Sequence, residues 1–195
     1  MTCNRCFLLL FCSAALVGLV FGDSMAGRPE TSSSTDRGLQ LLRLHDGAST
    51  FTILVAANAD LYNLPQGLRR VVVRIEDDVF SSEASLEASD GTLVLVPQFQ
   101  IIDGRPMPMD LPAWHGEQAW TGGELSSEGA VGLSAFAVLD GLVGYLKRSS
   151  HFSALQEMVF VGHGMAAELV ERHGMRPPTT ASFRIRHIRA QVVRR

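Results

Sequence analysis

The sequence predicts an α/β fold built on a mixed, mostly parallel β-sheet. Short runs rich in β-branched and aromatic residues recur at about residues 52, 72, 93, 159 and 184. A long amphipathic helix precedes the fourth run, and a second helix follows it. Strands that alternate with helices in this way are typical of β-α-β units, in which neighbouring strands run parallel.

Length and composition are those of one globular domain. The chain has 195 residues, of which 46% are hydrophobic, enough for one sizeable core. Its formal net charge is −3, and removal of a leader that contains Arg5 leaves 16 basic against 20 acidic residues, or −4. Because nucleic-acid binding favours a basic surface, we expect no nucleic-acid partner.

Residues 1–22 have the features of a secretory signal peptide. An apolar run over residues 7–21 follows Arg5, and small residues allow cleavage after Gly22 or after Ala26. The alternative is a membrane anchor, but the fifteen residues of this run fall short of the roughly 20 that span a bilayer as a helix. We therefore expect a secreted, extracellular protein with no stable membrane span. The leader contains all three cysteines, Cys3, Cys6 and Cys12.

The first part of the mature chain predicts a linker followed by a hairpin. Residues 27–37 are polar and rich in Ser and Thr, which is typical of a flexible linker, so we expect the domain to span residues 38–195. Two apolar runs, residues 39–44 and 51–56, flank an Asp-Gly turn, which predicts antiparallel strands at a sheet edge. A helix over residues 39–44 is the alternative, because six residues do not establish a period.

The middle of the chain predicts two strands and a long loop. Residues 70–75 and 92–96 are β-branched strands, and Pro97 follows the second at once. Residues 77–90, between them, are acidic and rich in serine and leave room for only a short crossover helix. Residues 98–132 contain three prolines and both tryptophans without a sustained period, and predict an ordered loop or lid.

The second half begins with a capped helix and ends with a strand. Ser134 is the expected N-cap of an amphipathic helix that ends near Lys147 and Arg148. Residues 182–193 predict a last strand with Phe183 and Ile185 on one face and arginines on the other. The arginines of this tail suit either an anionic partner or the protection of a sheet edge against aggregation.

Between these elements, residues 158–161 predict a buried strand and residues 165–173 a helix that ends at Gly174. The turn that joins them resembles the nucleophile elbow of α/β-hydrolases, G-x-S-x-G, in which a strained turn exposes a serine above the sheet. Glycine replaces that serine, and it adopts the strained backbone without steric cost but brings no nucleophile. This degenerate elbow consists of Gly162, His163, Gly164, Met165 and Ala166.

Further blocks resemble esterase-like α/β-hydrolases of bacteria and fungi. They lie at residues 58–73, 92–99, 114–123 and 134–140, within a resemblance that covers residues 52–195. The resemblance implies an incomplete α/β-hydrolase-like three-layer sandwich. It also makes three side chains candidates for lining a pocket, although the two tryptophans could equally pin the loop to the sheet. The three are Gln98, Trp114 and Trp120.

Departures from the family pattern argue against catalysis. Family members place His-Gly after the strand represented by residues 72–75, where the next loop helps to form the oxyanion hole. This chain has Glu76 and Asp77 there, whose negative charge would repel a developing oxyanion. The triad acid and histidine of this fold follow the elbow, and only 31 residues follow Gly164, so the resemblance implies a C-terminally truncated hydrolase.

Taken together, these features predict a catalytically inactive pseudoenzyme or a truncated esterase-type hydrolase. The alternatives are an active serine-type ester hydrolase with relocated or missing catalytic residues, and a secreted interaction module. The partner would be a small ester-like ligand or a protein at an open sheet edge. Since the six histidines show no metal-ligand spacing, we expect neither a metal nor a cofactor.

Overall fold

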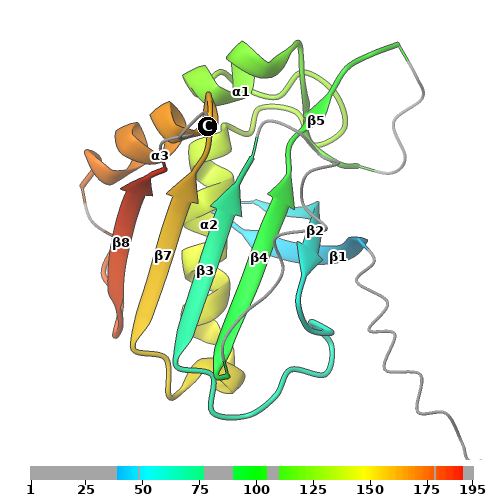
Figure 1. The fold of residues 1–195 in the computed structure, drawn as a ribbon. Helices are drawn as coiled ribbons and strands as arrows, with labels where there is room; N and C mark the ends of the chain where they lie inside the picture. The colour runs from blue at the N-terminus through cyan, green and yellow to red at the C-terminus, as the bar shows by residue number, and fades with distance from the viewer. Residues whose placement is uncertain (1–38, 48, 77–89, 105–109, 178, 191–195) are drawn as a thin grey trace, which may run out of the picture. The chain divides into compact units, whose positions relative to one another are not determined.

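A computed structural model describes residues 39–47, 49–76, 90–104, 110–177 and 179–190. Six strands form one mixed sheet in the order β1-β2-β4-β3-β7-β8 (Figure 1). The last four strands of this order run parallel, and the first two pair antiparallel. The predicted α/β class and the mixed, mostly parallel sheet are therefore confirmed. The strands are β1 (Leu39–His45), β2 (Thr50–Ala57), β3 (Arg70–Ile75), β4 (Thr92–Gln98), β7 (Glu157–Gly162) and β8 (Arg184–Arg189).

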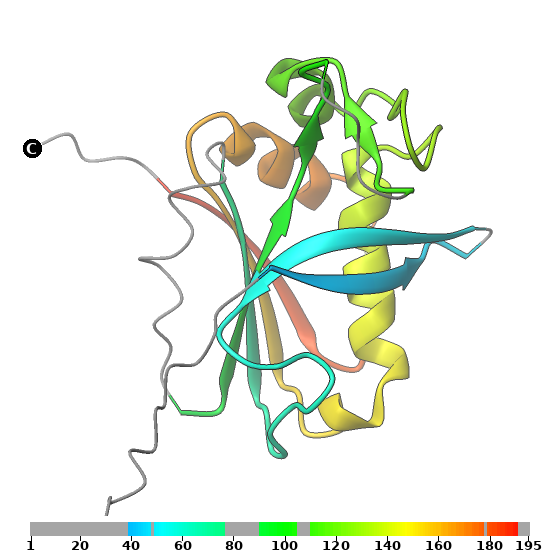
Figure 2. The same ribbon diagram turned by 90° about the vertical axis from the view of Figure 1, so that its right-hand side faces the viewer.

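Two helices cover one face of the sheet. Helix α2 (Ala135–Arg148) leads from the loop region to β7, and α3 (Ala166–Gly174) connects β7 to β8. Figures 1 and 2 both show α2 and α3 on the same side of the sheet. Residues 77–89 of the predicted crossover lie outside the described residues. Any third layer of the predicted sandwich that this crossover would form also lies outside them.

Side-chain alternation explains which face of the sheet is buried against the helices. In β3, Val71, Val73 and Ile75 are fully buried and belong to the main hydrophobic core, whereas the residues between them are partly exposed. The predicted cap of α2 is also present, since Ser134 Oγ accepts a hydrogen bond of 3.2 Å from the Ala137 N–H. The predicted strand over residues 70–75 and the predicted helix start are confirmed.

The predicted hairpin forms and packs against α2. Strands β1 and β2 pair antiparallel over their whole length, so the helical alternative for residues 39–44 is wrong. A Cβ atom on Gly141 of α2 would lie 3.1 Å from Phe51 and 3.3 Å from Leu44. Glycine at this position therefore lets the hairpin approach the helix closely, and the two views show the hairpin beside α2.

Several boundaries differ from the sequence prediction, and the last strand, predicted over residues 182–193, is described over Arg184–Arg189. Strand β4 continues through Pro97 to Gln98, because its pairing with β3 ends at Leu95 and Pro97 has only β2 as a neighbour. Helix α3 ends at Gly174 as predicted, with this glycine as its last residue. A Cβ atom there would lie 2.9 Å from the ring of His187, so this glycine allows close packing of α3 against β8.

The predicted loop over residues 98–132 contains short strands and a helix. The sequence did not predict them because hydrophobic residues show no sustained period there. They are β5 (Gln100–Ile101), β6 (Ala113–Trp114) and α1 (Glu117–Gly122), and β5 pairs with β6. A single turn of 3-10 helix, Ser150–Phe152, follows α2. Among the described helices, none is both long and apolar enough to cross a membrane.

Candidate functional site

The turn after β7 lies at the position where open α/β sheets bind ligands. From β3 the chain passes to β4 on one side and then, by way of α2, to β7 on the other side. The carboxyl ends of β3 and β7 therefore flank a topological switch point, outside which ligands commonly bind. Residues 162–166 and Glu76 both lie at this end of the sheet.

The turn itself has the tight geometry expected from the sequence. A Cβ atom on Gly162 would lie 2.5 Å from the Ala166 carbonyl oxygen and 2.6 Å from Ala167 Cα, so strand and helix meet too closely for a side chain. Gly164 has a φ angle of +56°, in the left-handed region that costs other residues roughly 1–2 kcal/mol. The His163 N–H donates to the Ile75 carbonyl oxygen at 3.0 Å, which ties the turn to β3.

No nucleophilic side chain stands at this turn. Gly164 is exposed but has no side chain, and Met165 next to it is 38% exposed with an unreactive thioether. On the facing strand, the Glu76 side chain is only 7% exposed and forms an ion pair with Arg74. The carboxylate of Glu76 is thus neutralised by a neighbour on its own strand, while Asp77 lies outside the described residues.

An open depression adjoins the turn. Its volume is ≈ 550 Å³, and Met165 lines it together with residues from β5 and from the start of α1. His115 and Glu117 bring an imidazole and a carboxylate to the same depression. The arrangement offers polar groups to a ligand, but no hydroxyl or thiol nucleophile is among the side chains that line it. The described residues that line it are Ile101, His115, Gly116, Glu117, Gln118 and Met165.

The three residues predicted to line a pocket are all buried. Trp120 is 2% exposed, and its ring stacks on Phe99 with centroids 4.5 Å apart. Trp114 is 1% exposed and donates its indole N–H to the Glu124 carbonyl oxygen at 3.0 Å. Gln98 donates to the Val96 carbonyl oxygen at 3.1 Å, within its own strand. These contacts favour the alternative that the tryptophans pin the loop to the sheet, and pocket lining stays a prediction.

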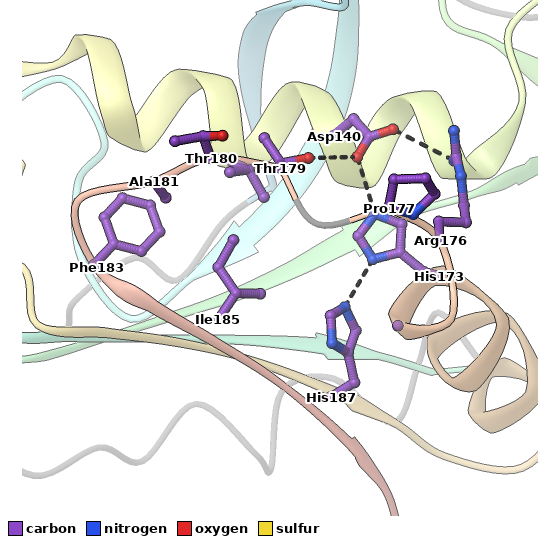
Figure 3. A pocket seen from close by; sticks show the side chains of 12 residues that line it. Asp140, His173, Arg176, Pro177, Thr179, Thr180, Ala181, Phe183, Ile185 and His187 are labelled. Atoms are coloured by element: carbon purple, nitrogen blue, oxygen red, sulfur yellow. Dashed lines mark hydrogen bonds and ion pairs between the residues drawn. The ribbon is translucent and has the colours of Figure 1, made fainter.

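A second group of polar side chains joins α2, α3 and β8. Asp140 Oδ1 lies 3.1 Å from His173 Nε2, and His173 Nδ1 lies 2.8 Å from His187 Nε2. Arg176 and Thr179 also contact the Asp140 carboxylate, at 3.4 Å each. Figure 3 shows Asp140, His173 and His187 in a line along one wall of a cavity of ≈ 520 Å³. We call this space, between α2, β8 and residues 174–177 and 179–181, the histidine cavity.

Burial and charge set the protonation of this line of side chains. Burial by itself would raise the pKa of the Asp140 carboxyl, but the hydrogen bond and charge of His173, with Arg176 and Thr179, together hold that pKa below its usual value. Burial, together with a smaller electrostatic contribution from the neighbouring His173, lowers the pKa of His187 to about 4. Asp140 is therefore ionised and His187 neutral around pH 7.

These shifts predict a loss of stability in mild acid. Between pH 6.5 and about 4 the unfolded chain protonates His187 while the folded chain does not, so the free energy of unfolding falls as the pH drops. The full shift would correspond to roughly 3 kcal/mol, and because His187 is half-buried we expect about 1–2 kcal/mol. Loss of the Asp140 charge below its usual pKa of 3.8 acts in the same direction.

Urea unfolding at the two ends of this pH range measures the effect. His187→Phe should flatten the pH dependence by about 1–2 kcal/mol, since it removes the titrating ring. His151→Phe, at an exposed histidine of the 3-10 turn, is the matched control and should leave the slope unchanged. Equal slopes for the His187 variant and the wild type would contradict the prediction.

No sequence motif indicated that Asp140, His173 and His187 would meet. His173 is 33 residues from Asp140 and 14 from His187, and no motif has these spacings. The one available signal was Asp140 itself, a carboxylate next to the apolar stripe of α2. Among the described residues, no group of three or more His, Cys, Asp or Glu side chains is placed to hold a metal ion.

The basic tail contributes ion pairs to the end of the sheet. Arg186 pairs with Glu157 of β7 at 3.3 Å, and Arg189 pairs with Glu171 of α3 at 3.1 Å. Both arginines are more than half exposed, so each pair contributes little stability. Arg194 and Arg195 lie outside the described residues.

Comparisons with known proteins give little further information. Neither a scan against models of protein families nor a search of curated proteins finds a match. Among solved structures, LpqC, a poly(3-hydroxybutyrate) depolymerase from Bordetella parapertussis, is similar at a TM-score of 0.41 and 15% sequence identity. The match covers 72% of this chain and 48% of that one, so the chain spans about half the length of the depolymerase. This likeness is too distant to assign a family or an activity.

Proposed function

We propose that the protein is a secreted α/β-hydrolase-like protein that binds a small ester-like ligand or a partner without hydrolysing it. The observation that carries the proposal is Gly164, held at a φ of +56° in a tight turn between β7 and α3. That turn has the shape of a nucleophile elbow, and its central residue lacks the hydroxyl that would attack a carbonyl.

The electrostatics at the carboxyl end of β3 support the same proposal. Acyl transfer requires hydrogen-bond donors around the developing oxyanion. Here Glu76 directly follows the strand, and its carboxylate is buried and paired with Arg74. A buried carboxylate at this place adds an acceptor where the reaction needs donors, so the site disfavours the transition state of ester hydrolysis.

Two measurements test the absence of hydrolysis. The purified chain should hydrolyse p-nitrophenyl acetate and p-nitrophenyl butyrate no faster than a mock preparation. It should also remain unlabelled by a fluorophosphonate probe, because Gly164 stands where the elbow would carry the activated serine. The alternative, an ester hydrolase with a relocated nucleophile, predicts a covalent adduct on one serine and loss of turnover when that serine becomes alanine. Either result would overturn the proposal.

An interaction module is the second candidate function. It is favoured by β8, the outermost strand of the described sheet, whose outer edge has no strand beside it in the described part of the chain. Such an edge accepts an added strand from a partner. Capture of a protein partner from culture supernatant, lost when residues 114–123 are shortened, would favour this function over a ligand-binding one.

A further inference from the structure

We propose that the histidine cavity binds a small neutral molecule with an apolar body and a hydroxyl group, an alcohol or a phenol. Its hydroxyl would donate a hydrogen bond to Nδ1 of His187. The cavity is formed by the helix face of β8 together with α2 and residues 174–177 and 179–181. The proposal is therefore independent of the elbow, which lies at the carboxyl ends of β3 and β7.

With His173 neutral, the hydrogen bonds along this line of side chains determine the tautomers of both histidines. An ionised carboxylate only accepts hydrogen bonds, so at Asp140 the 3.1 Å contact requires a proton on His173 Nε2. In neutral His173 the other nitrogen, Nδ1, then has a lone pair and accepts at 2.8 Å from His187 Nε2–H. His187 has its proton on Nε2, and its Nδ1 is left as a hydrogen-bond acceptor.

This acceptor is open to a ligand. Among the described residues, none hydrogen-bonds to Nδ1 of His187, since the ring's one recorded hydrogen bond is that of Nε2 to His173. In the same part of the chain, every fully buried side-chain nitrogen or oxygen has a partner. The unpaired nitrogen must therefore be accessible, and His187 is one of the residues that line the cavity.

The remaining walls define the body of the ligand. Val143, Phe183 and Ile185 line the cavity with apolar surface, and Figure 3 shows Phe183 at the opposite end from Asp140 and Arg176. A volume of ≈ 520 Å³ lies within the range of small-molecule pockets. An apolar body placed against Phe183 and Ile185 would bring a polar head toward His187.

Charge in the cavity disfavours ionic heads. The Asp140 carboxylate already receives hydrogen bonds from His173 and Thr179 and an ion pair from Arg176, so it has little capacity left for a cation. An anion would approach that same carboxylate and the lone pair of His187, both of which repel negative charge. A neutral hydroxyl needs no free carboxylate and is not repelled by negative charge.

A pair of probes tests the hydroxyl directly on the unmodified chain. p-Cresol can donate to His187, whereas 4-methylanisole has the same ring and oxygen but no proton to donate. We expect p-cresol to bind about tenfold more tightly, the ratio that corresponds to one hydrogen bond of about 1.4 kcal/mol. Titration followed by the ring resonances of His187 measures both affinities. Equal affinities, no binding of millimolar p-cresol, or shifts confined to the depression at Met165 would overturn the proposal.

Variants and tautomers give a second test. His187→Phe should abolish the preference for p-cresol, while His151→Phe, at an exposed histidine, should retain it. Nitrogen-15 chemical shifts of the wild type should show the proton on Nε2 in both His173 and His187. A proton on Nδ1 of His187 would contradict the assignment. If the His187 variant fails to fold, the probe pair and the nitrogen shifts on the wild type still decide the question.

Discussion

Replacing Trp120 with alanine is expected to lower the free energy of unfolding by about 3–5 kcal/mol, the usual cost of removing a buried large aromatic side chain. Trp120 is 2% exposed and stacks on Phe99 at 4.5 Å with an angle of 5° between the rings. It lies in α1, a helix of only six residues that has little stability of its own. Its loss should therefore both open a cavity and release α1 from the sheet.

Urea unfolding followed by far-ultraviolet circular dichroism measures this loss without relying on tryptophan fluorescence. Trp120→Phe is the matched variant, because phenylalanine keeps an aromatic ring against Phe99 and leaves a smaller cavity. We expect it to lose less than half as much stability as the alanine variant. If Trp120→Ala costs under 1 kcal/mol, Trp120 does not anchor the loop, and a role in lining a ligand pocket becomes the better interpretation.

Gly162→Ala is expected to cost about 3 kcal/mol, because it overpacks a junction that has no room for a methyl group. The added Cβ would lie 2.5 Å from the Ala166 carbonyl oxygen and 2.6 Å from Ala167 Cα. Both are backbone positions of α3, so relief of the clash requires the helix to move away from the strand. Since Ala166 is fully buried, that movement would also disturb the core.

Gly122→Ala is the matched control for this substitution. Gly122 is the last residue of helix α1, as Gly162 is the last residue of strand β7. A Cβ atom on Gly122 meets nothing within 4 Å, and alanine is the better helix former. Its melting temperature should stay equal to that of the wild type or rise. If the two variants behave alike, the close approach of β7 and α3 is not present in solution, and the comparison of the turn with a nucleophile elbow fails with it.

The elbow could be predicted from the sequence, whereas the histidine cavity could not. The elbow was predictable because a strand, two closely spaced glycines and a helix start are contiguous, and the turn follows from local backbone chemistry. The absence of the elbow serine was equally predictable, because it depends on the identity of one residue, Gly164. The histidine cavity was not predictable, because its polar wall is assembled from α2, α3 and β8.

Burial is the second property that local patterns did not reveal. Residues 98–132 have no sustained period, so the sequence did not show that Trp114 and Trp120 would form an aromatic cluster with Phe99. Gly174 is a similar case. The sequence predicted that the helix ends at this glycine, as it does, but not that the glycine packs against the ring of His187.

The sequence by itself determined the α/β class, the strand over residues 70–75, the capped helix that follows Ser134 and the tight turn at Gly164. Each depends on periodicity, capping or backbone freedom within a few neighbouring residues. Only the tertiary structure decided the order of the strands, the burial of the tryptophans and the meeting of Asp140, His173 and His187. Those features are contacts between residues far apart in the chain, and such contacts arise only when the strands and helices pack together.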